Sequence, residues 1–407
     1  MRLWRTSPVS GVTLVRGEGT RVWDDRGRSY VDLLSGTWCN VLGYGCPELV
    51  EAIRDQAGKL VHSGTPFGTR EVDDALDALR EIVPPKLDRV VLTNTGSESV
   101  ELALKIACAA SGGAPSAVVG GGYYGATSYA YSLSEAGRNA TWLPGSESTL
   151  RLPTPHCARC PKRETCRGTC PCLDPFSDQL EAAGGRISAV LYEPVIGGGI
   201  LVPPVGYGKR LRKFADSCGA LLIAEEVTTG MGRTGKWFGF EHDDITPDIL
   251  VLGKILGGGL PVAAVVTTED VERRSADVLG RHVQSHQNDP FSGRIASTVI
   301  GILSRGGFVE RARVVGERLL GGLRKLAREI PAIRDVRGRG AMVGAELAPQ
   351  YADRGPELSR ALLDAGFIQD FHVPTSTLRL FPPFVTETDD LDAFTGAFGR
   401  SAAALLR

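Results

Sequence analysis

The sequence predicts an α/β protein in which a mostly parallel sheet is covered by helices, with a smaller α+β domain beside it. Between about residues 45 and 290, short apolar runs alternate with segments of helical spacing. Strands that alternate with helices pair in parallel and bury both faces of their sheet, so they are apolar throughout. The chain has 407 residues, of which 42% are hydrophobic, and this length is typical of two domains.

The N-terminal part and the tail depart from this alternation. Residues 16–34 alternate apolar and polar side chains around turn residues, which predicts short antiparallel strands. The tail begins with one long helical stretch at about 294–329 and continues with two strand-like segments, 333–347 and 376–384. We therefore expect an N-terminal segment that joins the small domain, a large domain and a C-terminal small domain, at 1–44, 45–290 and 291–407.

The elements of the large domain follow from local patterns. Helical spacing predicts two helices near its start, and Gly and Ser open a third helix after the first buried strand. Each later strand is a short apolar run that ends in glycine or an acid. The expected helices are 47–60, 71–83 and 95–110, and the expected strands are 89–94, 116–121, 187–195, 220–227 and 249–253.

Charge and hydropathy exclude several classes of partner. The 46 basic and 47 acidic side chains leave a net charge of -1, which provides no electrostatic attraction to nucleic acid or to a membrane surface. No run approaches the ~20 apolar residues of a membrane span, and the N-terminus has no apolar stretch of signal-peptide length. We expect a cytoplasmic protein.

Two strand ends carry residues suited to an anion and to a flat ring. Thr95-Gly96-Ser97-Glu98 lies between a strand and a helix, where backbone N–H groups bind anions, although the same residues also form an ordinary helix cap. Residues 120–127, GGGYYGAT, place an aromatic pair after three glycines. This pair suits either stacking on a ring or packing within a loop.

Two further strand ends carry an acid and a lysine. Glu225 ends a buried strand, where a carboxylate needs a cation or a hydrogen-bond donor, and a structural salt bridge would serve as well as a ligand. Lys254 follows an apolar strand among glycines. Unless it points to solvent, its amine is partly desolvated and suited to forming a Schiff base. Because parallel strands bind ligands at their carboxyl edge, the four strand ends should converge. Together they specify pyridoxal phosphate.

The same residues lie in motifs that resemble those of class III (omega-type) pyridoxal-phosphate-dependent aminotransferases. The resemblance runs from about residue 16 to the C-terminus. Its motifs, in family order, are TGSESVELALKIA, GGYYGAT, EPVIGGGILVPPVGY, LLIAEEVTTGMGRTGKWFG, PDILVLGKILGGGLP, DVRGRGAMVGAEL and LRLFPPF. The resemblance implies the type I pyridoxal-phosphate transferase fold and a homodimer with shared active sites.

The resemblance also implies roles for single residues. Lys254 matches the lysine that holds the cofactor as an internal aldimine and shuttles protons, and Glu225 stands where the partner of the ring nitrogen is found. Ser285 matches a residue that reaches the phosphate of the neighbouring subunit. Trp38 and Arg379 match substrate-binding positions, and the planar fork of Arg379 grips a carboxylate. The implied cofactor-binding set is Thr95, Gly96, Ser97, Tyr123, Tyr124, Glu193, Glu225, Val227, Lys254 and Ser285.

Three positions depart from the family pattern. Glu225 replaces the usual aspartate, and we expect its pairing with the ring nitrogen to survive the extra methylene. Tyr124 replaces a histidine. Gly198 replaces an acid that masks the carboxylate-binding arginine in members specialised for glutamate-type donors. With Trp38 and Cys39, this glycine points to the amine–pyruvate subgroup, whose members accept substrates without an α-carboxylate.

Five of the nine cysteines form a cluster, HCARCPKRETCRGTCPC, within an insertion at about 156–174. In a reducing compartment such a cluster indicates a metal site more often than disulfides. Zinc is favoured over an iron–sulfur cluster, and unpaired thiols are the alternative. His156 is a further candidate ligand. The expected ligands are Cys157, Cys160, Cys166, Cys170 and Cys172.

The predicted function is transfer of an amino group from an amino acid or amine to a ketone, aldehyde or keto acid by a ping-pong mechanism. The reaction fits a biosynthetic pathway, and small molecules are the expected substrates. A racemase or aminomutase of the same fold is the alternative, since it would use the same residues. Two further alternatives are a non-catalytic metal-binding or regulatory protein and a redox sensor built on the cysteine cluster.

Overall fold

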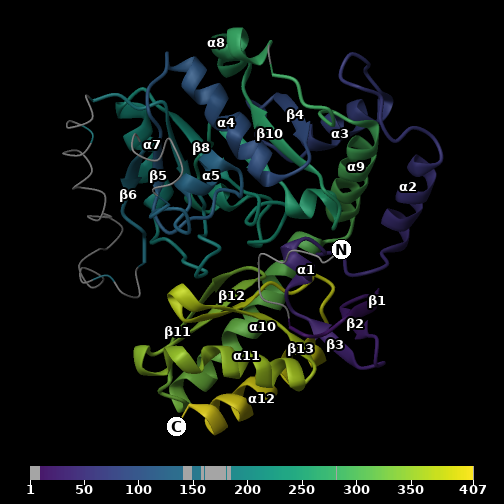
Figure 1. Ribbon diagram of the computed structural model, residues 1–407, viewed down its shortest axis with the longest axis vertical. Coiled ribbons are helices and arrows are strands. Elements are labelled where there is room, and N and C mark those ends of the chain that lie inside the picture. The colour runs from purple at the N-terminus through teal and green to yellow at the C-terminus, as the bar shows by residue number, and fades with distance from the viewer. Residues whose placement is uncertain are drawn as a thin grey trace.

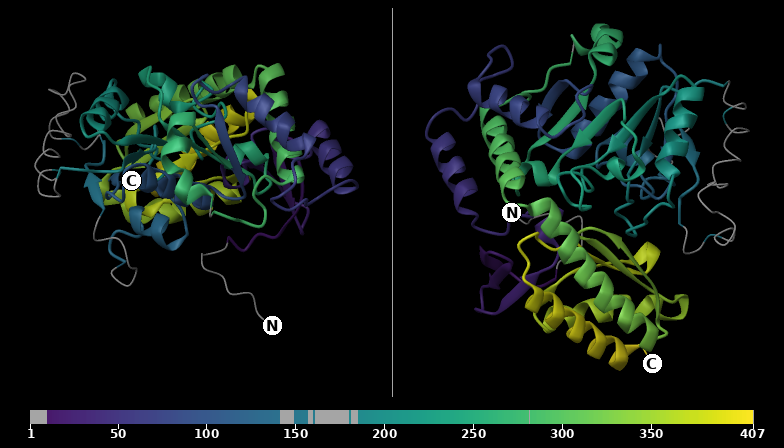
Figure 2. Two further views of the ribbon diagram at one scale, coloured as in Figure 1. Left: turned by 90° about the horizontal axis from the view of Figure 1, so that it is seen from above. Right: turned by 180° about the vertical axis from the view of Figure 1, so that it is seen from behind.

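The computed structural model describes residues 10–140, 149–156, 160, 180, 185–280 and 282–406. The molecule has two halves (Figure 1). The larger half is built on one wide sheet with helices on both faces. The smaller half combines the C-terminal part of the chain with the N-terminal strands, and Figure 2 shows the same arrangement from above and from behind.

The sheet of the larger half has seven strands and is mostly parallel, as the sequence predicted. The exception is β10 (Ala263–Thr267), which is antiparallel to both neighbours, β4 (Arg89–Thr93) and β9 (Ile249–Leu252). From β9 the sheet continues in parallel through β8 (Leu221–Glu225), β7 (Ala189–Tyr192), β5 (Ala117–Val119) and β6 (Leu150–Leu152).

The apolar strands bury both faces of this sheet. In β8, Leu221 and Ile223 join one core cluster, whereas Leu222 and Ala224 join the other. The first cluster lies under α4 (Gly96–Ala110), which packs against β9, β10 and α8 (Glu269–Leu279). Other helical segments of this half within the described residues are α2 (Pro47–Ala57), α3 (Arg70–Arg80), α5 (Ser128–Leu133), α7 (Tyr207–Ser217), η3 (Gly239–Asp243), η4 (Lys254–Gly257) and α9 (Pro290–Arg305).

The smaller half contains two four-stranded sheets. The strands β1 (Leu14–Glu18), β2 (Arg21–Asp24) and β3 (Ser29–Asp32) continue into β13 (Phe367–Ile368), which pairs with β3 in parallel. The expected link between the N-terminal strands and the small domain therefore runs through β13. The other sheet has the order β11 (Ile333–Arg339), β12 (Met342–Leu347), β15 (Thr377–Leu380) and β14 (Asp370–His372).

Helices cover the smaller half and connect it to the larger one. They are α1 (Ser35–Trp38), η5 (Pro349–Arg354), α10 (Phe308–Glu329), α11 (Gly355–Asp364), η6 (Val373–Thr375) and α12 (Thr388–Leu405). No helix among the described residues has both the length and the apolar character needed to cross a membrane.

The single long helix expected at 294–329 is wrong, because the structure has two helices there. Gly306 and Gly307 separate α9 from α10, and Gly307 adopts φ 62°, a left-handed conformation that glycine reaches without steric cost. The first of the two helices packs against α2 and α3 of the larger half. The helix α9 therefore packs with the larger half.

Candidate active site

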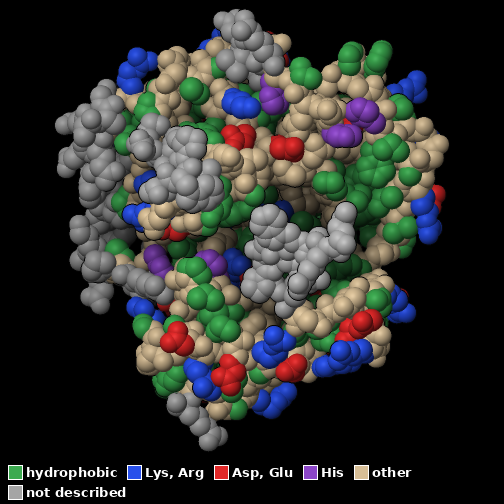
Figure 3. Space-filling view, viewed as in Figure 1, with side chains coloured by type: hydrophobic (Ala, Val, Ile, Leu, Met, Phe, Trp, Pro, Cys, Tyr) green, Lys and Arg blue, Asp and Glu red, His purple; other side chains and the backbone are tan. Residues whose placement is uncertain are grey.

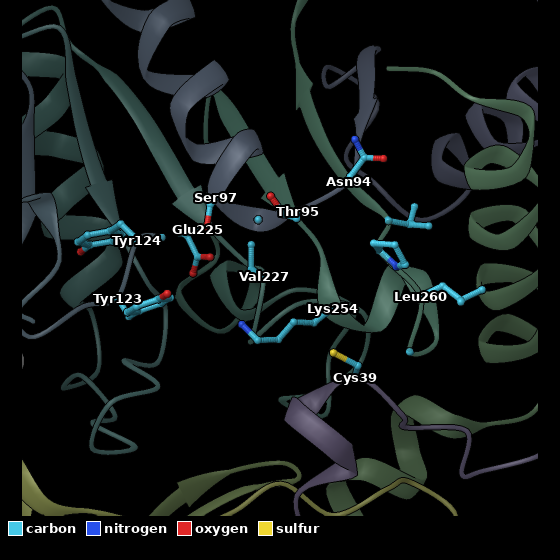
Figure 4. Close-up of a pocket in the computed structure, with 15 residues that line it drawn as sticks. Cys39, Asn94, Thr95, Ser97, Tyr123, Tyr124, Glu225, Val227, Lys254 and Leu260 are labelled. Carbon is cyan, nitrogen blue, oxygen red and sulfur yellow. The ribbon is translucent and has the colours of Figure 1, made fainter. Parts of the chain in front are cut away.

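A cavity of about 390 Å³ lies at the carboxyl edge of the large sheet, as expected for a parallel arrangement. Its walls come from the segments after β4, β8 and β9 and from Tyr123 and Tyr124. Figure 4 shows Glu225 and the Lys254 amine pointing into the same space, with Ser97 and Thr95 at the helix start above them. On the face seen in Figure 3, a hollow separates the two halves and apolar side chains gather around it.

The start of α4 is both capped and open to a ligand. The Thr95 hydroxyl accepts the Glu98 N–H at 3.2 Å, and the Glu98 carboxylate accepts the Thr95 N–H at 2.9 Å, so the capping box is present. The N–H groups of Gly96 and Ser97 have no acceptor among the described residues. The capping box therefore leaves these N–H groups available to an anion, so the two interpretations that the sequence posed as alternatives are compatible.

The two adjacent acids at the end of β8 face different surroundings. The Glu226 carboxylate accepts the Thr229 hydroxyl at 2.5 Å and the N–H groups of Gly239 and Phe240 at 2.9 and 2.8 Å, so it holds a loop. Glu225 lines the cavity. Burial and the neighbouring carboxylate of Glu193 raise the pKa of Glu225, while the Lys254 ammonium opposes this rise. Such a carboxylate requires a positively charged or N–H donor in the cavity.

The amine of Lys254 is half-buried at the start of η4. Its Nζ donates a hydrogen bond to the Thr228 hydroxyl at 3.0 Å and lies 5.0 Å from the centroid of the Trp38 ring. Burial lowers the pKa of the amine, and the carboxylates of Glu225 and Glu193 oppose this effect. Lys254 also adopts φ 45°, a left-handed conformation that is strained for a side chain with a Cβ and that occurs preferentially at functional sites.

Glu193 and the two tyrosines form the wall beside β7. The Glu193 carboxylate accepts the N–H groups of Tyr123 and Gly197, each at 2.7 Å, while burial raises its pKa to about 7. Tyr123 is half exposed, with its ring at the cavity. Tyr124 also borders the cavity but is buried, and its hydroxyl donates to the Val119 carbonyl at 2.6 Å. This hydroxyl is therefore already satisfied within the protein.

The residues present fit pyridoxal phosphate. The free N–H groups at the start of α4 suit the phosphate, the Glu225 carboxylate suits a protonated ring nitrogen, and the Lys254 amine suits the aldehyde. Gly96 gives the site its shape, because a Cβ there would lie 2.8 Å from Val227 Cγ2. Val227 can thus pack against the start of α4 because position 96 has no side chain.

Trp38 and Arg379, the expected substrate-binding residues, do not line the cavity itself but lie next to the Lys254 amine, which is 5.0 Å from the Trp38 ring centroid. The Trp38 ring stacks on Phe381 with centroids 4.3 Å apart, and the Arg379 guanidinium lies 5.0 Å from the Trp38 centroid. Position 198 is a glycine, so it supplies no acid to Arg379. Arg379 nevertheless has a counter-ion. Its guanidinium pairs with Asp370, which sequence analysis did not identify.

Ser285 lies outside this cavity. It is exposed and is not among the residues that line the cofactor pocket of its own chain. Its loop is held by Asp289, whose carboxylate oxygens lie 2.6 Å from Nδ1 of His62 and 2.6 Å from Nδ1 of His286. The loop before α9 and the loop after α2 therefore lie side by side.

Most of the cysteine cluster lies outside the described residues. Cys157, Cys166, Cys170 and Cys172 belong to this group, whereas Cys160 is described as a half-buried free thiol. Next to the cluster, His156 Nε2 lies 3.3 Å from Oε2 of Glu346, a buried acid of the smaller half.

Besides Asp370, sequence reasoning missed Thr228 and Arg233, whereas Cys39 had been named with Trp38 in the segment that indicates the subgroup. Thr228 binds the Lys254 amine, and Cys39 lines the cavity. Burial raises the pKa of the Cys39 thiol, and the charge of Lys254 opposes this rise. Arg233 is fully buried and donates to the carbonyls of Ala341, Pro382 and Trp38, which fixes the backbone under the Trp38 ring. Thr228 could have been found from the sequence, because it lies only three residues beyond Glu225 in the same segment.

Known proteins resemble this chain over almost its full length. A family model described as aminotransferase class-III matches residues 5–401. An acetylornithine aminotransferase of Methanopyrus kandleri is 35% identical over 382 residues, which cover 94% of this chain and 92% of that protein. A leucine/methionine racemase of Thermococcus litoralis is 32% identical, covering 94% of this chain and 88% of that protein.

The solved structures agree with the sequence comparison. A PLP-bound amine transaminase from an uncultivated Pseudomonas species superposes with a TM-score of 0.91 at 25% identity, covering 100% of this chain and 99% of that one. The fold, the donor set of the cavity and the family match point to one conclusion: the chain belongs to the class III aminotransferases, pyridoxal-phosphate-dependent enzymes with the type I fold.

Proposed function

We propose that the protein transfers an amino group from an amino acid or amine donor to a ketone, aldehyde or keto-acid acceptor in two half-reactions. The observation that carries this proposal is the convergence of the Lys254 amine and the Glu225 carboxylate on one cavity. Bound pyridoxal phosphate supplies an aldehyde that takes up the amino group and a ring that withdraws electrons. Every other task falls to side chains of this chain.

Lys254 is the residue that moves the proton. Burial lowers the pKa of its amine, and in its neutral form Nζ would accept a proton from the substrate carbon. The Thr228 hydroxyl, 3.0 Å away, orients Nζ between transfers. Glu225 holds a proton at the ring nitrogen by pairing its carboxylate with the N–H. Glu193 fixes the Tyr123 and Gly197 backbone beside the ring edge through its two hydrogen bonds.

Trp38 and Arg379 are the proposed substrate-binding residues. The Trp38 ring lies 5.0 Å from both Lys254 Nζ and the Arg379 guanidinium, so it spans the distance between the reacting amine and the carboxylate site. An apolar substrate stem would pack on this ring. We propose a donor and acceptor of biosynthetic metabolism, and the amine–pyruvate type of specificity is the one that Gly198 favours.

The test of this function separates binding of the cofactor from turnover. Borohydride reduction followed by peptide mass spectrometry should find the cofactor mass on the peptide that contains Lys254, and Lys254→Ala should lose it. Single amine donors should then convert the lysine-bound cofactor to its aminated form, and a carbonyl acceptor should restore it. Absence of the adduct from the wild-type protein would contradict the proposal and favour the non-catalytic alternative.

Racemisation is the second candidate, because a leucine/methionine racemase is among the relatives. A racemase returns the proton to the same carbon and needs no acceptor. Stereoinversion of a single amino acid without any carbonyl substrate would support it, whereas stoichiometric formation of a keto product would support amino transfer.

We further propose a homodimer in which each subunit serves the other's active site. Ser285 is exposed beside Val283, and both lie next to the loop that carries the exposed apolar residues Leu60, Val61 and Phe67. Sedimentation should give a dimer. Mixing Lys254→Ala subunits with Ser285→Ala subunits should restore one intact site per hybrid dimer, and a monomer would refute the proposal.

For the cysteine cluster we propose a structural zinc site, with an iron–sulfur cluster as the other metal that thiolates would hold. The support is the sequence alone. Elemental analysis of the purified protein should give about one zinc per chain, a value typical of a four-thiolate structural site, and Cys160→Ser should lower it. A metal-free protein with unchanged thermal stability would favour unpaired thiols instead.

A further inference from the structure

Asp370 and Arg379 lie opposite each other on neighbouring strands. They form a register pair between the antiparallel strands β14 and β15, and the Asp370 carboxylate is ion-paired with Nη2 of Arg379. Both side chains are at least partly shielded, with Arg379 at 12% and Asp370 at 35% exposure. The pair is therefore built into the sheet and does not depend on a loop.

The other donors of Arg379 are incompletely used. Nη1 lies 3.2 Å and 3.3 Å from the carbonyls of Gly197 and Gly198, which are long contacts, and the buried Nε has no hydrogen-bond partner among the described residues. A fully structural arginine in the same half looks different. Arg337 donates to the carbonyls of Gly199 and Ile200 and to two carboxylates. Arg379 thus retains capacity for a second anion.

The other described ionisable groups near Arg379 do not neutralise its guanidinium, so the Asp370 charge has this role. Burial and the Arg379 charge lower the pKa of His372 to about 4, while the Asp370 charge opposes this effect, so the imidazole is uncharged near pH 7 and adds no charge beside the guanidinium. Glu193 acts on the arginine only through space, and its carboxylate is occupied by two backbone N–H groups. Asp370 is the carboxylate that contacts the guanidinium among the described residues.

The position of His372 explains why the counter-ion comes from β14. A Cβ at Gly198 would lie 3.6 Å from His372 Cε1 and 3.4 Å from the Gly121 carbonyl. The imidazole therefore occupies the space into which a longer acidic side chain at position 198 would extend. An acid from the neighbouring strand reaches the same guanidinium without entering that space.

We propose that Asp370 is a positioning residue that sets substrate class through Arg379. When the bound substrate has no carboxylate at this place, Asp370 neutralises the guanidinium. When an α-carboxylate arrives, it displaces Asp370 and takes over Nη2 and the unused Nε. The proposal rests on the proposed aminotransferase function, and it makes the site one that accepts both carboxylate-bearing and carboxylate-free partners in its two half-reactions.

The charge of Asp370 competes directly with the substrate carboxylate. Two carboxylates at one guanidinium repel each other, so the incoming anion must break the internal pair before it binds. Replacing Asp370 by asparagine removes the competing charge while keeping the size and shape of the side chain. Carboxylate binding should then become tighter, whereas amines without a carboxylate should meet an uncompensated cation.

The experiment compares wild type, Asp370→Asn and the matched control Asp364→Asn, whose side chain is exposed at the end of α11. The first readout is the affinity of the cofactor-loaded protein for propionate, which carries a carboxylate and no amine. We expect Asp370→Asn to bind propionate about tenfold more tightly, a difference of ~1.4 kcal/mol, and Asp364→Asn to equal wild type. Unchanged or weaker binding would overturn the proposal, because a purely structural aspartate would not restrain the anion.

The second readout is the half-reaction with L-alanine and with an arylalkyl amine. The ratio of kcat/KM for alanine over the amine should rise in Asp370→Asn, mainly through a lower KM for alanine. If the ratio in Asp370→Asn stays within about twofold of the wild-type ratio, the proposal is also overturned. Failure of the aminotransferase function itself is distinguishable, since the wild-type protein would then lack the borohydride-trapped adduct on Lys254.

Discussion

Gly96→Ala should weaken cofactor binding by pushing Val227 into the ring site. The added Cβ would lie 2.8 Å from Cγ2 and 2.9 Å from Cγ1 of Val227. Carbon atoms in contact prefer about 3.5–4.0 Å, so the valine must move by roughly 0.7 Å. Val227 also lines the cavity, so a shift away from the new methyl group changes the wall of the ring site.

The expected size of the effect follows from overpacking. Forcing an extra methyl group into a packed site costs about 1–3 kcal/mol, which corresponds to roughly a five- to hundredfold higher Kd for pyridoxal phosphate. Titration of the apoprotein with the cofactor, followed by absorbance, measures this directly. The double variant Gly96→Ala with Val227→Ala removes the crowding and should bind like Val227→Ala alone.

A second glycine provides the control. Gly321 lies inside α10, and nothing lies within 4 Å of the position its Cβ would occupy. Gly321→Ala should leave cofactor affinity unchanged and stabilise the protein by up to ~1 kcal/mol through helix propensity. Wild-type affinity in Gly96→Ala, or no recovery in the double variant, would refute the steric reasoning.

Three other predictions concern stability and the amine. Burial raises the pKa of Glu226 from 4.5 to about 7, so its charged form is disfavoured in the folded state and its contribution is greatest at low pH. Relative to Glu226→Gln, the wild type should lose up to about 3 kcal/mol of unfolding free energy between pH 5 and 8, and a pH-independent difference in urea titrations would contradict this. Gly316→Ala should destabilise by more than ~3 kcal/mol, because the new Cβ would lie 1.7 Å from the Gly340 carbonyl oxygen; an unchanged urea midpoint would rule this out. Thr228→Val removes the acceptor for Nζ of Lys254, so the pH at which this amine becomes reactive to an acylating reagent should fall rather than stay or rise.

The position of the site could be predicted from the sequence because it depends on local patterns. Glu225 and Lys254 each follow a short apolar run, and strand ends of a parallel sheet meet at one edge. Thr95 and Glu98 carried a capping signature that the structure contains. These features need only a few neighbouring residues to be recognised.

The contacts between distant segments could not be predicted in the same way. The pattern of apolar residues does not reveal that β10 runs antiparallel to its neighbours. An antiparallel strand that is buried on both faces is as apolar as a parallel one. The break of the tail helix had a local signal, Gly306-Gly307, but helical spacing continues on both sides and hides it. The pairing of Asp370 with Arg379 needs the register of β14 and β15, which a nine-residue separation with a turn at 373–375 permits but does not fix.

The pairing of β3 with β13 has a consequence for synthesis of the chain. Val31 meets its partner Phe367 only after about 330 further residues have been made. At roughly 5–20 residues per second, the first three strands leave the ribosome tens of seconds before the segment that completes their sheet. During that interval the free edge of β3 is open to pairing with other chains, so a nascent polypeptide stalled before residue 367 should be a preferred client of chaperones.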